Sequence, residues 1–167
     1  AIFNVRDALA FALNMPANHV RVIKHYMGGG FGSKLELGKY TVIAALLARR
    51  ASRPVKLFLT REEDQLNTGN RPATIQHVKV GVKKDGSLTA IELKSLNANG
   101  AYLGGAGCGA PYREMYLCSN VRTEEYAVYI NAGRSRPTRA PGHVPGTFGW
   151  ELMMDIVANK IGRDALE

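Results

Sequence analysis

The chain has 167 residues, a formal net charge of +8, and 46% hydrophobic against 22% charged residues, which is an ordinary composition for a globular domain. No stretch approaches the roughly 18 uninterrupted apolar residues that a transmembrane helix requires. Only two cysteines and four scattered histidines occur, without a CxxC motif, so neither a disulfide-built scaffold nor a structural zinc site is expected. The basic residues are spread along the chain without a nucleic-acid-binding motif. We therefore expect a solvated basic surface, with no nucleic-acid and no membrane partner.

The N-terminal half predicts helices that alternate with strands around a glycine-rich loop. The expected elements are a helix over 8–13 capped by Asn4, a strand over 19–24, a tight loop over 28–34, a largely buried helix over 35–50, a strand over 55–59 and a short acidic helix capped by Thr60. The glycines at 28–32 exclude a regular element there, because clustered glycine favours turns.

The C-terminal half predicts a hairpin, one further strand and a final helix. Two alternating runs, 75–82 and 88–96, are joined by Lys83-Lys84-Asp85-Gly86, and Asp-Gly between such runs is a strong hairpin signal. The remaining expected segments are an irregular stretch over 97–111, a strand over 125–131, an irregular stretch over 133–146 and a helix from Thr147 that ends at Gly162. The predicted fold class is α+β, a mixed sheet with helices packed against it, in a single domain over residues 1–167.

The loop over 28–34 lies between an expected strand and an expected helix, where glycine loops often bind phosphate. Glycine lacks a Cβ, so the backbone can approach a ligand closely, and amides at a helix start attract anions. Two well-known patterns nevertheless fail: Ser33-Lys34-Leu35 is not the end of a P-loop, and GxGxxG from Gly28 requires a sixth-position glycine where Ser33 stands. The simpler interpretation, that these glycines only turn the chain, stays open.

A second irregular segment, over 135–142, holds Arg136 directly before Pro137, and Arg139 between Pro137 and Pro141. Proline fixes φ and stiffens the loop, so an arginine there is presented with little freedom. A stiffly held guanidinium suits recognition of a planar oxygen-bearing group or of a developing negative charge. The alternative is an arginine that only bonds nearby carbonyl groups and so holds the loop. The two cysteines, Cys108 and Cys118, are expected to be free, partly buried thiols.

Several motifs occur in one order along nearly the whole chain. They are Gly28-Gly29-Gly30-Phe31-Gly32-Ser33-Lys34, Arg53-Pro54-Val55-Lys56, Thr60-Arg61-Glu62-Glu63-Asp64, the Asp85-Gly86 hairpin, Asn99-Gly100-Ala101-Tyr102, Arg139-Ala140-Pro141-Gly142 and Glu151. Each is weak alone, but the ordered set resembles the large, molybdopterin-binding subunit of the xanthine dehydrogenase/aldehyde oxidase family. In particular, the first motif resembles that family's GGGFGxK signature.

The resemblance implies an oxidoreductase that hydroxylates an aldehyde carbon, or a carbon beside nitrogen in a heterocycle, with oxygen derived from water. The implied cofactor is molybdenum-molybdopterin, with iron–sulfur clusters and FAD in partner domains or subunits. Gly29, Gly30, Phe31 and Gly32 match the loop that passes close to this cofactor. Arg139 matches the family's active-site arginine, which orients substrate or stabilises charge on it. No residue of the chain is expected to ligate a metal.

The resemblance also implies that the chain is an inner fragment of a larger subunit. The family's catalytic glutamate lies downstream of the matching region, so the fragment is expected to be inactive alone. Its expected partners are the rest of the large subunit, iron–sulfur and flavin subunits, and a small aldehyde or heterocycle, and its expected location is the cytoplasm. Ala140 stands where the carbon monoxide dehydrogenase branch has cysteine, which disfavours that substrate. Two alternatives stay open: a non-catalytic structural or interaction module of the same fold, and an unrelated anion-binding domain.

Overall fold

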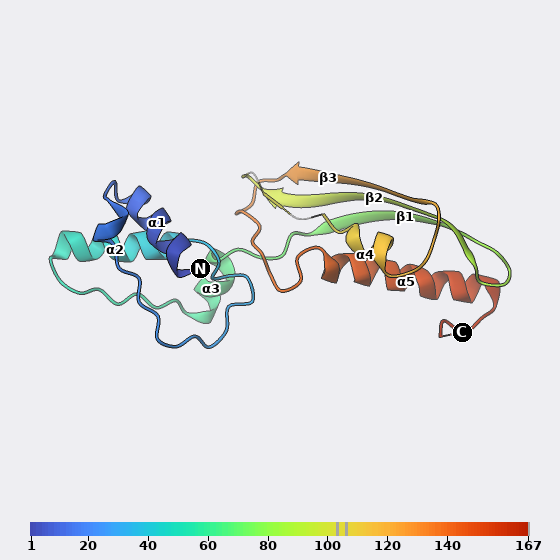
Figure 1. Cartoon of the computed structure of the whole chain (residues 1–167), viewed down its shortest axis with the longest axis horizontal. Helices are drawn as coiled ribbons and strands as arrows, with labels where there is room; N and C mark the ends of the chain where they lie inside the picture. The colour runs from blue at the N-terminus through green and yellow to red at the C-terminus, as the bar shows by residue number, and fades with distance from the viewer. Residues whose placement is uncertain (103, 106, 167) are drawn as a thin grey trace. The chain divides into compact units, whose positions relative to one another are not determined.

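The computed structural model describes residues 1–102, 104–105 and 107–166, and the chain divides into two compact units (Figure 1). Unit 1 comprises residues 1–70 and 136–139, and unit 2 comprises residues 71–135 and 140–167. In chain order the elements are α1 (Ile2–Ala12), the 3₁₀ turn η1 (Ala17–His19), α2 (Lys39–Ala51), α3 (Arg61–Asn67), β1 (Thr74–Val82), β2 (Leu88–Gly100), α4 (Ala110–Glu114), β3 (Val121–Tyr129) and α5 (His143–Ile161). Leu103, Ala106 and Glu167 lie outside the described residues.

Unit 2 contains a three-stranded mixed sheet in the order β1-β2-β3. The alternating runs predicted as a hairpin pair antiparallel, with Val78 opposite Leu93, and β3 joins the other edge of β2 in parallel. Gly86 has a φ of 91° in the hairpin turn, a backbone conformation that suits glycine. The predicted hairpin and the α+β class with a mixed sheet are therefore confirmed.

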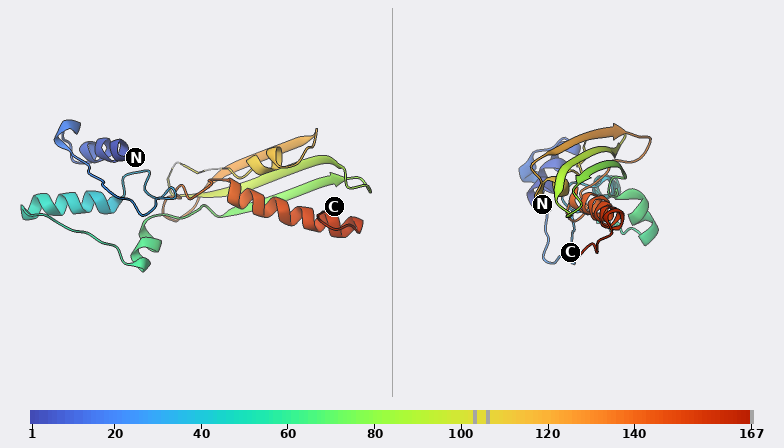
Figure 2. Two further views of the ribbon diagram at one scale, coloured as in Figure 1. Left: turned by 60° about the horizontal axis from the view of Figure 1, so that its bottom comes forward. Right: turned by 90° about the vertical axis from the view of Figure 1, so that its right-hand side faces the viewer.

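Helix α5 lies along one face of this sheet, as the turned views in Figure 2 show. The buried core between them consists of Ile91, Leu93, Cys108, Tyr112 and Trp150. The Tyr112 and Trp150 rings pack with centroids 5.1 Å apart, so the aromatic side chains of α4 and α5 fill the centre of the layer. The sheet alternates between this buried face and an open face, because successive strand residues point to opposite sides.

Three boundaries in unit 2 differ from those expected. β2 continues to Gly100, since Asn97, Ala98 and Gly100 pair with neighbouring strands, with a break in register between Ala98 and Gly100; β3 begins at Val121, before the expected strand over 125–131. α5 begins at His143 because proline is tolerated in the first helical turn, and Pro145 lies there. The predicted end of this helix is confirmed, since Gly162 closes it in the left-handed conformation with a φ of 70°.

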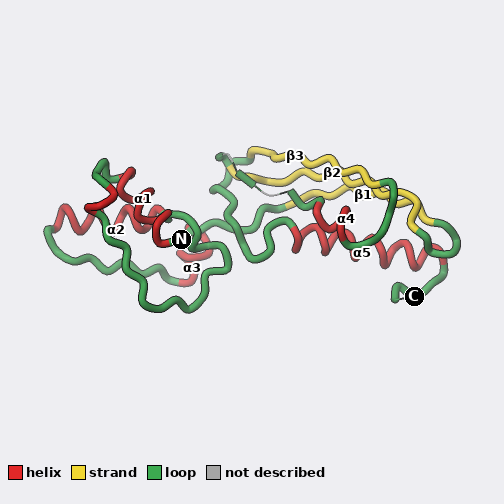
Figure 3. Tube along the Cα trace, viewed as in Figure 1, coloured by secondary structure: helices red, strands yellow, loops and turns green. Residues whose placement is uncertain are grey.

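Unit 1 consists of helices joined by long segments without strand pairing (Figure 3). The strands expected over 19–24 and 55–59 are wrong, because no described segment of this unit pairs with either of them. α1 begins at Ile2, so Asn4 lies inside the helix and is not its cap. An alternating sequence alone does not make a strand, since the ladder needs a hydrogen-bonding neighbour.

The expectation that the second helix is buried is also wrong. α2 contains no buried residue, and the side chains of Ile43, Leu46 and Leu47 are 46%, 42% and 47% exposed. The described part of the chain therefore leaves this apolar side of the helix half open to solvent. Over the described ranges, no helix combines the length and the apolar character needed to cross a membrane.

The predicted cap of α3 is confirmed in full. The Glu63 backbone N–H donates to Thr60 Oγ1 at 3.2 Å, and the Thr60 N–H donates to Glu63 Oε2 at 2.8 Å. These two bonds form a capping box, which satisfies two donors that a helix start would otherwise leave unpaired. The same bonds lower the pKa of Glu63 below its ordinary value of 4.5, because they favour the ionised carboxylate.

Candidate functional site

The glycine loop of unit 1 turns through unusual backbone conformations. Gly29 and Gly32 have φ values of 116° and 100°, which residues other than glycine rarely adopt. Phe31 lies between them at a φ of 47°, and its side chain is 66% exposed. A left-handed conformation at a residue with a side chain costs about 1 kcal/mol or more. Such strain persists only where surrounding contacts enforce it.

Four consecutive carbonyl groups of the loop accept hydrogen bonds from within unit 1. The donors are Lys34 Nζ to Gly29 O at 2.6 Å, Ser33 N and Oγ to Gly30 O at 3.0 and 2.9 Å, Arg139 N to Phe31 O at 2.8 Å, and Leu35 N to Gly32 O at 3.2 Å. The loop therefore has its carbonyl oxygens paired by its own unit.

The backbone N–H groups of the same loop, unlike its carbonyl groups, are not paired with the backbone of the described residues. In the described residues, no backbone carbonyl oxygen accepts from the N–H groups of Gly28 to Gly32. Successive amides in a glycine-rich turn form a concave donor surface that suits anionic oxygen atoms. Because the loop carbonyl oxygens accept hydrogen bonds from within the protein, the N–H groups of the loop remain available to donate to an anion.

Residues 136–139, the arginine segment, pack directly against this loop within unit 1. Besides the bond from Arg139 N to Phe31 O, Arg136 Nη1 lies 3.9 Å from Glu36 Oε2. A Cβ built on Gly32 would come within 2.7 Å of the Pro137 carbonyl carbon, so only glycine permits this approach. The structure thus brings together all the predicted site residues, the loop from Gly29 to Gly32 and Arg139.

The loop borders two cavities of unit 1. One of about 550 Å³ is also lined by the first turn of α1, and one of about 780 Å³ is also lined by residues 57–61. Gly28, Gly30 and Lys34 line both cavities. A Cβ on Gly28 would meet nothing within 4 Å, and one on Gly30 would meet only Met27 and Lys34 at 3.6 Å or more. Space for a ligand is therefore available beside the backbone of these two glycines.

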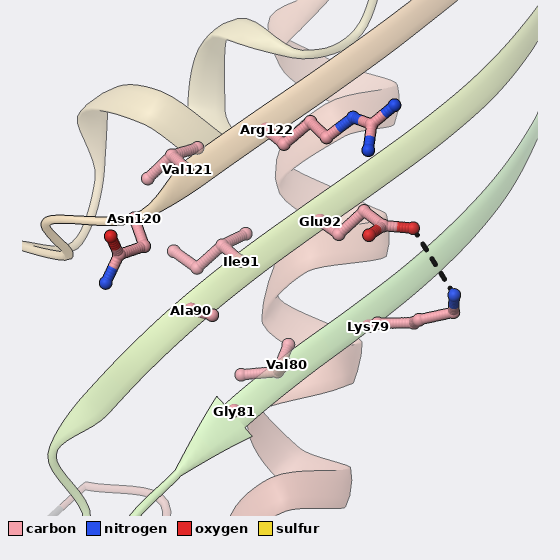
Figure 4. A pocket seen from close by; sticks show the side chains of 9 residues that line it. All are labelled: Lys79, Val80, Gly81, Ala90, Ile91, Glu92, Asn120, Val121 and Arg122. Carbon is pink, nitrogen blue, oxygen red and sulfur yellow. Dashed lines mark hydrogen bonds and ion pairs between the residues drawn. The ribbon is translucent and has the colours of Figure 1, made fainter.

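A further hollow, of about 440 Å³, lies on the sheet of unit 2 (Figure 4). Its charged residues form a row across the strands, since Lys79 pairs with Glu92 at 3.4 Å and Glu92 is in register with Arg122. Opposite charges on neighbouring strands stabilise a water-facing sheet surface modestly. This row fits a solvated face, so it is not a candidate site.

The two cysteines are free, as expected. Cys108 is fully buried in the core of unit 2, and burial raises the pKa of its thiol above the ordinary value of 9.0. A buried neutral thiol is a poor nucleophile. No group of three or more His, Cys, Asp or Glu residues that could hold a metal ion occurs among the residues the structure describes. The donors offered by the site are thus backbone amides rather than metal-ligating side chains.

Sequence reasoning missed three contributors to the site. Ser33 and Lys34 were part of the glycine-loop motif but were assigned no role in the site, although both hold loop carbonyls. No sequence motif predicts the ion pair between Arg136 and Glu36, because the two residues are distant in the chain.

Comparison with known proteins identifies relatives of almost the whole chain. The chain is 38% identical over 164 residues to the aldehyde oxidoreductase molybdenum-binding subunit PaoC of Escherichia coli strain K12, covering 97% of this chain and 22% of that protein. It is 32% identical over 169 residues to the xanthine dehydrogenase molybdenum-binding subunit of Escherichia coli O157:H7, covering 98% of this chain and 22% of that protein. The chain therefore spans about a fifth of the length of these relatives.

Solved structures show the same fold. Quinoline 2-oxidoreductase from Pseudomonas putida 86 matches with a TM-score of 0.85 at 25% identity, over 98% of this chain and 22% of that chain. The aldehyde oxidoreductase from Desulfovibrio gigas matches with a TM-score of 0.78 at 26% identity, over 98% of this chain and 19% of that chain. The family model described as the molybdopterin cofactor-binding domain matches residues 1–167. The chain therefore belongs to the molybdopterin cofactor-binding domain family, in the large subunits of molybdenum hydroxylases.

Proposed function

We propose that this chain supplies the cofactor loop and the substrate-facing arginine of a molybdenum hydroxylase, which oxidises an aldehyde or an N-heterocycle with oxygen derived from water. Relatives named for aldehyde, xanthine and quinoline oxidation support this class of reaction. Because the chain spans about a fifth of those proteins, the activity belongs to the whole enzyme. The fragment alone is expected to be inactive.

The observation that carries the proposal is the donor surface of the glycine loop. Molybdopterin carries phosphate oxygens and polar ring atoms, and the N–H groups from Gly29 to Gly32 have no backbone carbonyl acceptor among the described residues. The paired carbonyls and the cavities beside Gly28 and Gly30 fit a group held through such oxygens. The residues present therefore fit the cofactor that the family name gives.

In this assignment the chain positions the cofactor and the substrate. The cofactor, when bound, supplies the two-electron redox chemistry. The backbone from Gly29 to Gly32 donates hydrogen bonds to the cofactor and approaches it closely. Arg139 is held at its backbone by Phe31 O, and its side chain orients the substrate or stabilises negative charge that develops on it. Iron–sulfur clusters and FAD in partner domains or subunits would take up the electrons.

The half-exposed apolar side of α2 supports the expectation that this chain contacts the rest of the large subunit. Ile43, Leu46 and Leu47 expose apolar surface that a stable protein normally buries. We assign this face to contact with the rest of the large subunit, with residues 1–167 acting together as part of its cofactor-binding region.

The test uses the intact native protein that contains this sequence. Elemental mass spectrometry should find about one molybdenum per chain, and Arg139→Ala should lower kcat strongly while molybdenum content stays near that of the wild type. An absence of molybdenum from freshly prepared protein would favour a non-catalytic module of the same fold. Unchanged kinetics in Arg139→Ala would remove this residue from the reaction.

Gly30→Ala tests the loop separately. The added methyl group meets only ordinary contacts in the protein, with its closest neighbour Met27 Sδ at 3.6 Å, so the fold should be retained. It would project where the cofactor is proposed to lie, and molybdenum content should fall. Wild-type molybdenum content and turnover rate in this variant would show that the loop does not contact the cofactor.

A further inference from the structure

We infer that Ser33 and Lys34 are positioning residues, which fix the direction of the loop amides by holding the carbonyl groups that precede them. The inference rests on the proposed function of the loop.

The physical basis is the planarity of the peptide bond. In a trans peptide the C=O of one residue and the N–H of the next lie in one plane and point in opposite directions. The chain contains no cis peptide bond among its described residues. A donor that holds a carbonyl oxygen on one side therefore holds the following N–H toward the other side.

Two of these peptides are fixed by side chains. Lys34 Nζ holds Gly29 O at 2.6 Å, which directs the N–H of Gly30 away from the lysine. Ser33 Oγ holds Gly30 O at 2.9 Å, which directs the N–H of Phe31 away from the serine. Free glycine peptides rotate readily, so these bonds reduce the entropy that the loop would lose when a ligand binds.

A third peptide is fixed by the arginine segment. Arg139 N donates to Phe31 O at 2.8 Å, which directs the N–H of Gly32 away from that segment. One hydrogen bond thereby sets both the backbone position of Arg139 and the direction of a loop amide. Donors from three residues thus fix three successive amides, and this explains how strained φ values at Phe31 and its neighbours persist.

The role of Lys34 can be separated from a general attraction of its charge for an anion. Lys34→Met removes the donor at similar side-chain length, whereas Lys34→Arg keeps a charged donor. Lys39, exposed at the first position of α2, provides the matched control, because Lys39→Met removes one positive charge five residues further along the chain without touching a loop carbonyl. The hydrogen bond of Lys34 is itself exposed, so replacing this side chain should leave the fold intact.

Ser33 provides an independent check. Its backbone N–H also donates to Gly30 O at 3.0 Å, so Ser33→Ala removes one of two bonds to that oxygen. We expect a smaller effect than for Lys34→Met, and Ser33→Thr, which keeps the hydroxyl group, should restore the wild-type behaviour.

The experiment measures the rate at which molybdenum is lost from the intact protein during dialysis, together with hydrogen exchange of the peptide that spans residues 28–35. Lys34→Met should lose molybdenum about tenfold faster, the scale of one charge-assisted hydrogen bond, and Ser33→Ala about threefold faster. Exchange in this peptide should rise in both variants. Lys34→Arg, Ser33→Thr and Lys39→Met should match the wild type.

Two results would overturn the inference. One is a wild-type rate of loss in both Lys34→Met and Ser33→Ala while Gly30→Ala still loses molybdenum; in that case the loop contacts the cofactor but these side chains do not position it. The other is equal loss in Lys34→Met and Lys39→Met, which would show a general charge effect. If Gly30→Ala also behaved like the wild type, the proposed contact between loop and cofactor would itself be wrong.

Discussion

Replacing Gly32 by alanine should separate the glycine loop from the arginine segment. Gly32 has a φ of 100°, and its Cβ would lie 2.7 Å from the carbonyl carbon of Pro137. The backbone conformation costs about 1–2 kcal/mol for a residue with a side chain, and the overlap with a backbone group adds about 1–3 kcal/mol. The packed arrangement is therefore destabilised by about 2–5 kcal/mol.

A loss of about 2 kcal/mol or more reduces the equilibrium ratio of the packed to the unpacked arrangement about 30-fold or more. Because a ligand binds only the competent fraction, its apparent affinity falls in proportion to that fraction, by up to the same factor once the unpacked arrangement dominates. Molybdenum per chain, measured after gel filtration of intact Gly32→Ala protein, should be far below that of the wild type. Gly133→Ala is the matched control, since a Cβ there meets nothing within 4 Å and the φ is not in the left-handed region. Wild-type molybdenum content and unfolding temperature in Gly32→Ala would refute the close approach of the two segments.

Three further predictions test the rest of the structure. Leu93→Ala should lower the free energy of unfolding by about 2–5 kcal/mol, because Leu93 is fully buried in the core of unit 2; a change below about 1 kcal/mol by denaturant titration would contradict that core. Thr60→Ala should destabilise α3 by about 1 kcal/mol, seen as faster hydrogen exchange of this helix. Since the cap lowers the pKa of Glu63, its stabilisation is present above the ordinary value of 4.5 and is lost as the pH falls through the lower folded-state pKa; protection factors of α3, corrected for the intrinsic exchange rate at each pH, that did not fall in acid would argue against the cap. Iodoacetamide should label the half-buried Cys118 before Cys108, whose pKa is raised by burial, and equal labelling in the native protein, by mass spectrometry, would contradict this order.

The elements that could be predicted from the sequence depend on interactions within a few residues. The Asp85-Gly86 hairpin, the capping box of Thr60 and the glycine end of α5 each form from neighbouring groups, so their sequence signals suffice. The family resemblance likewise rested on short motifs in a fixed order. The glycine loop was recognisable as irregular because clustered glycine cannot form a regular element.

What the sequence could not determine depends on partners that are distant in the chain. The alternating residues 19–24 and 55–59 lacked a neighbouring strand among the described segments, and the apolar side chains of α2 stayed half exposed. The parallel pairing of β3 with β2 and the bond from Arg139 N to Phe31 O also join separate segments. The sequence by itself therefore determined the order of the motifs, and with it the family. Only the tertiary structure decided how the loop amides are oriented, because that orientation is set by donors that folding brings to the loop carbonyls.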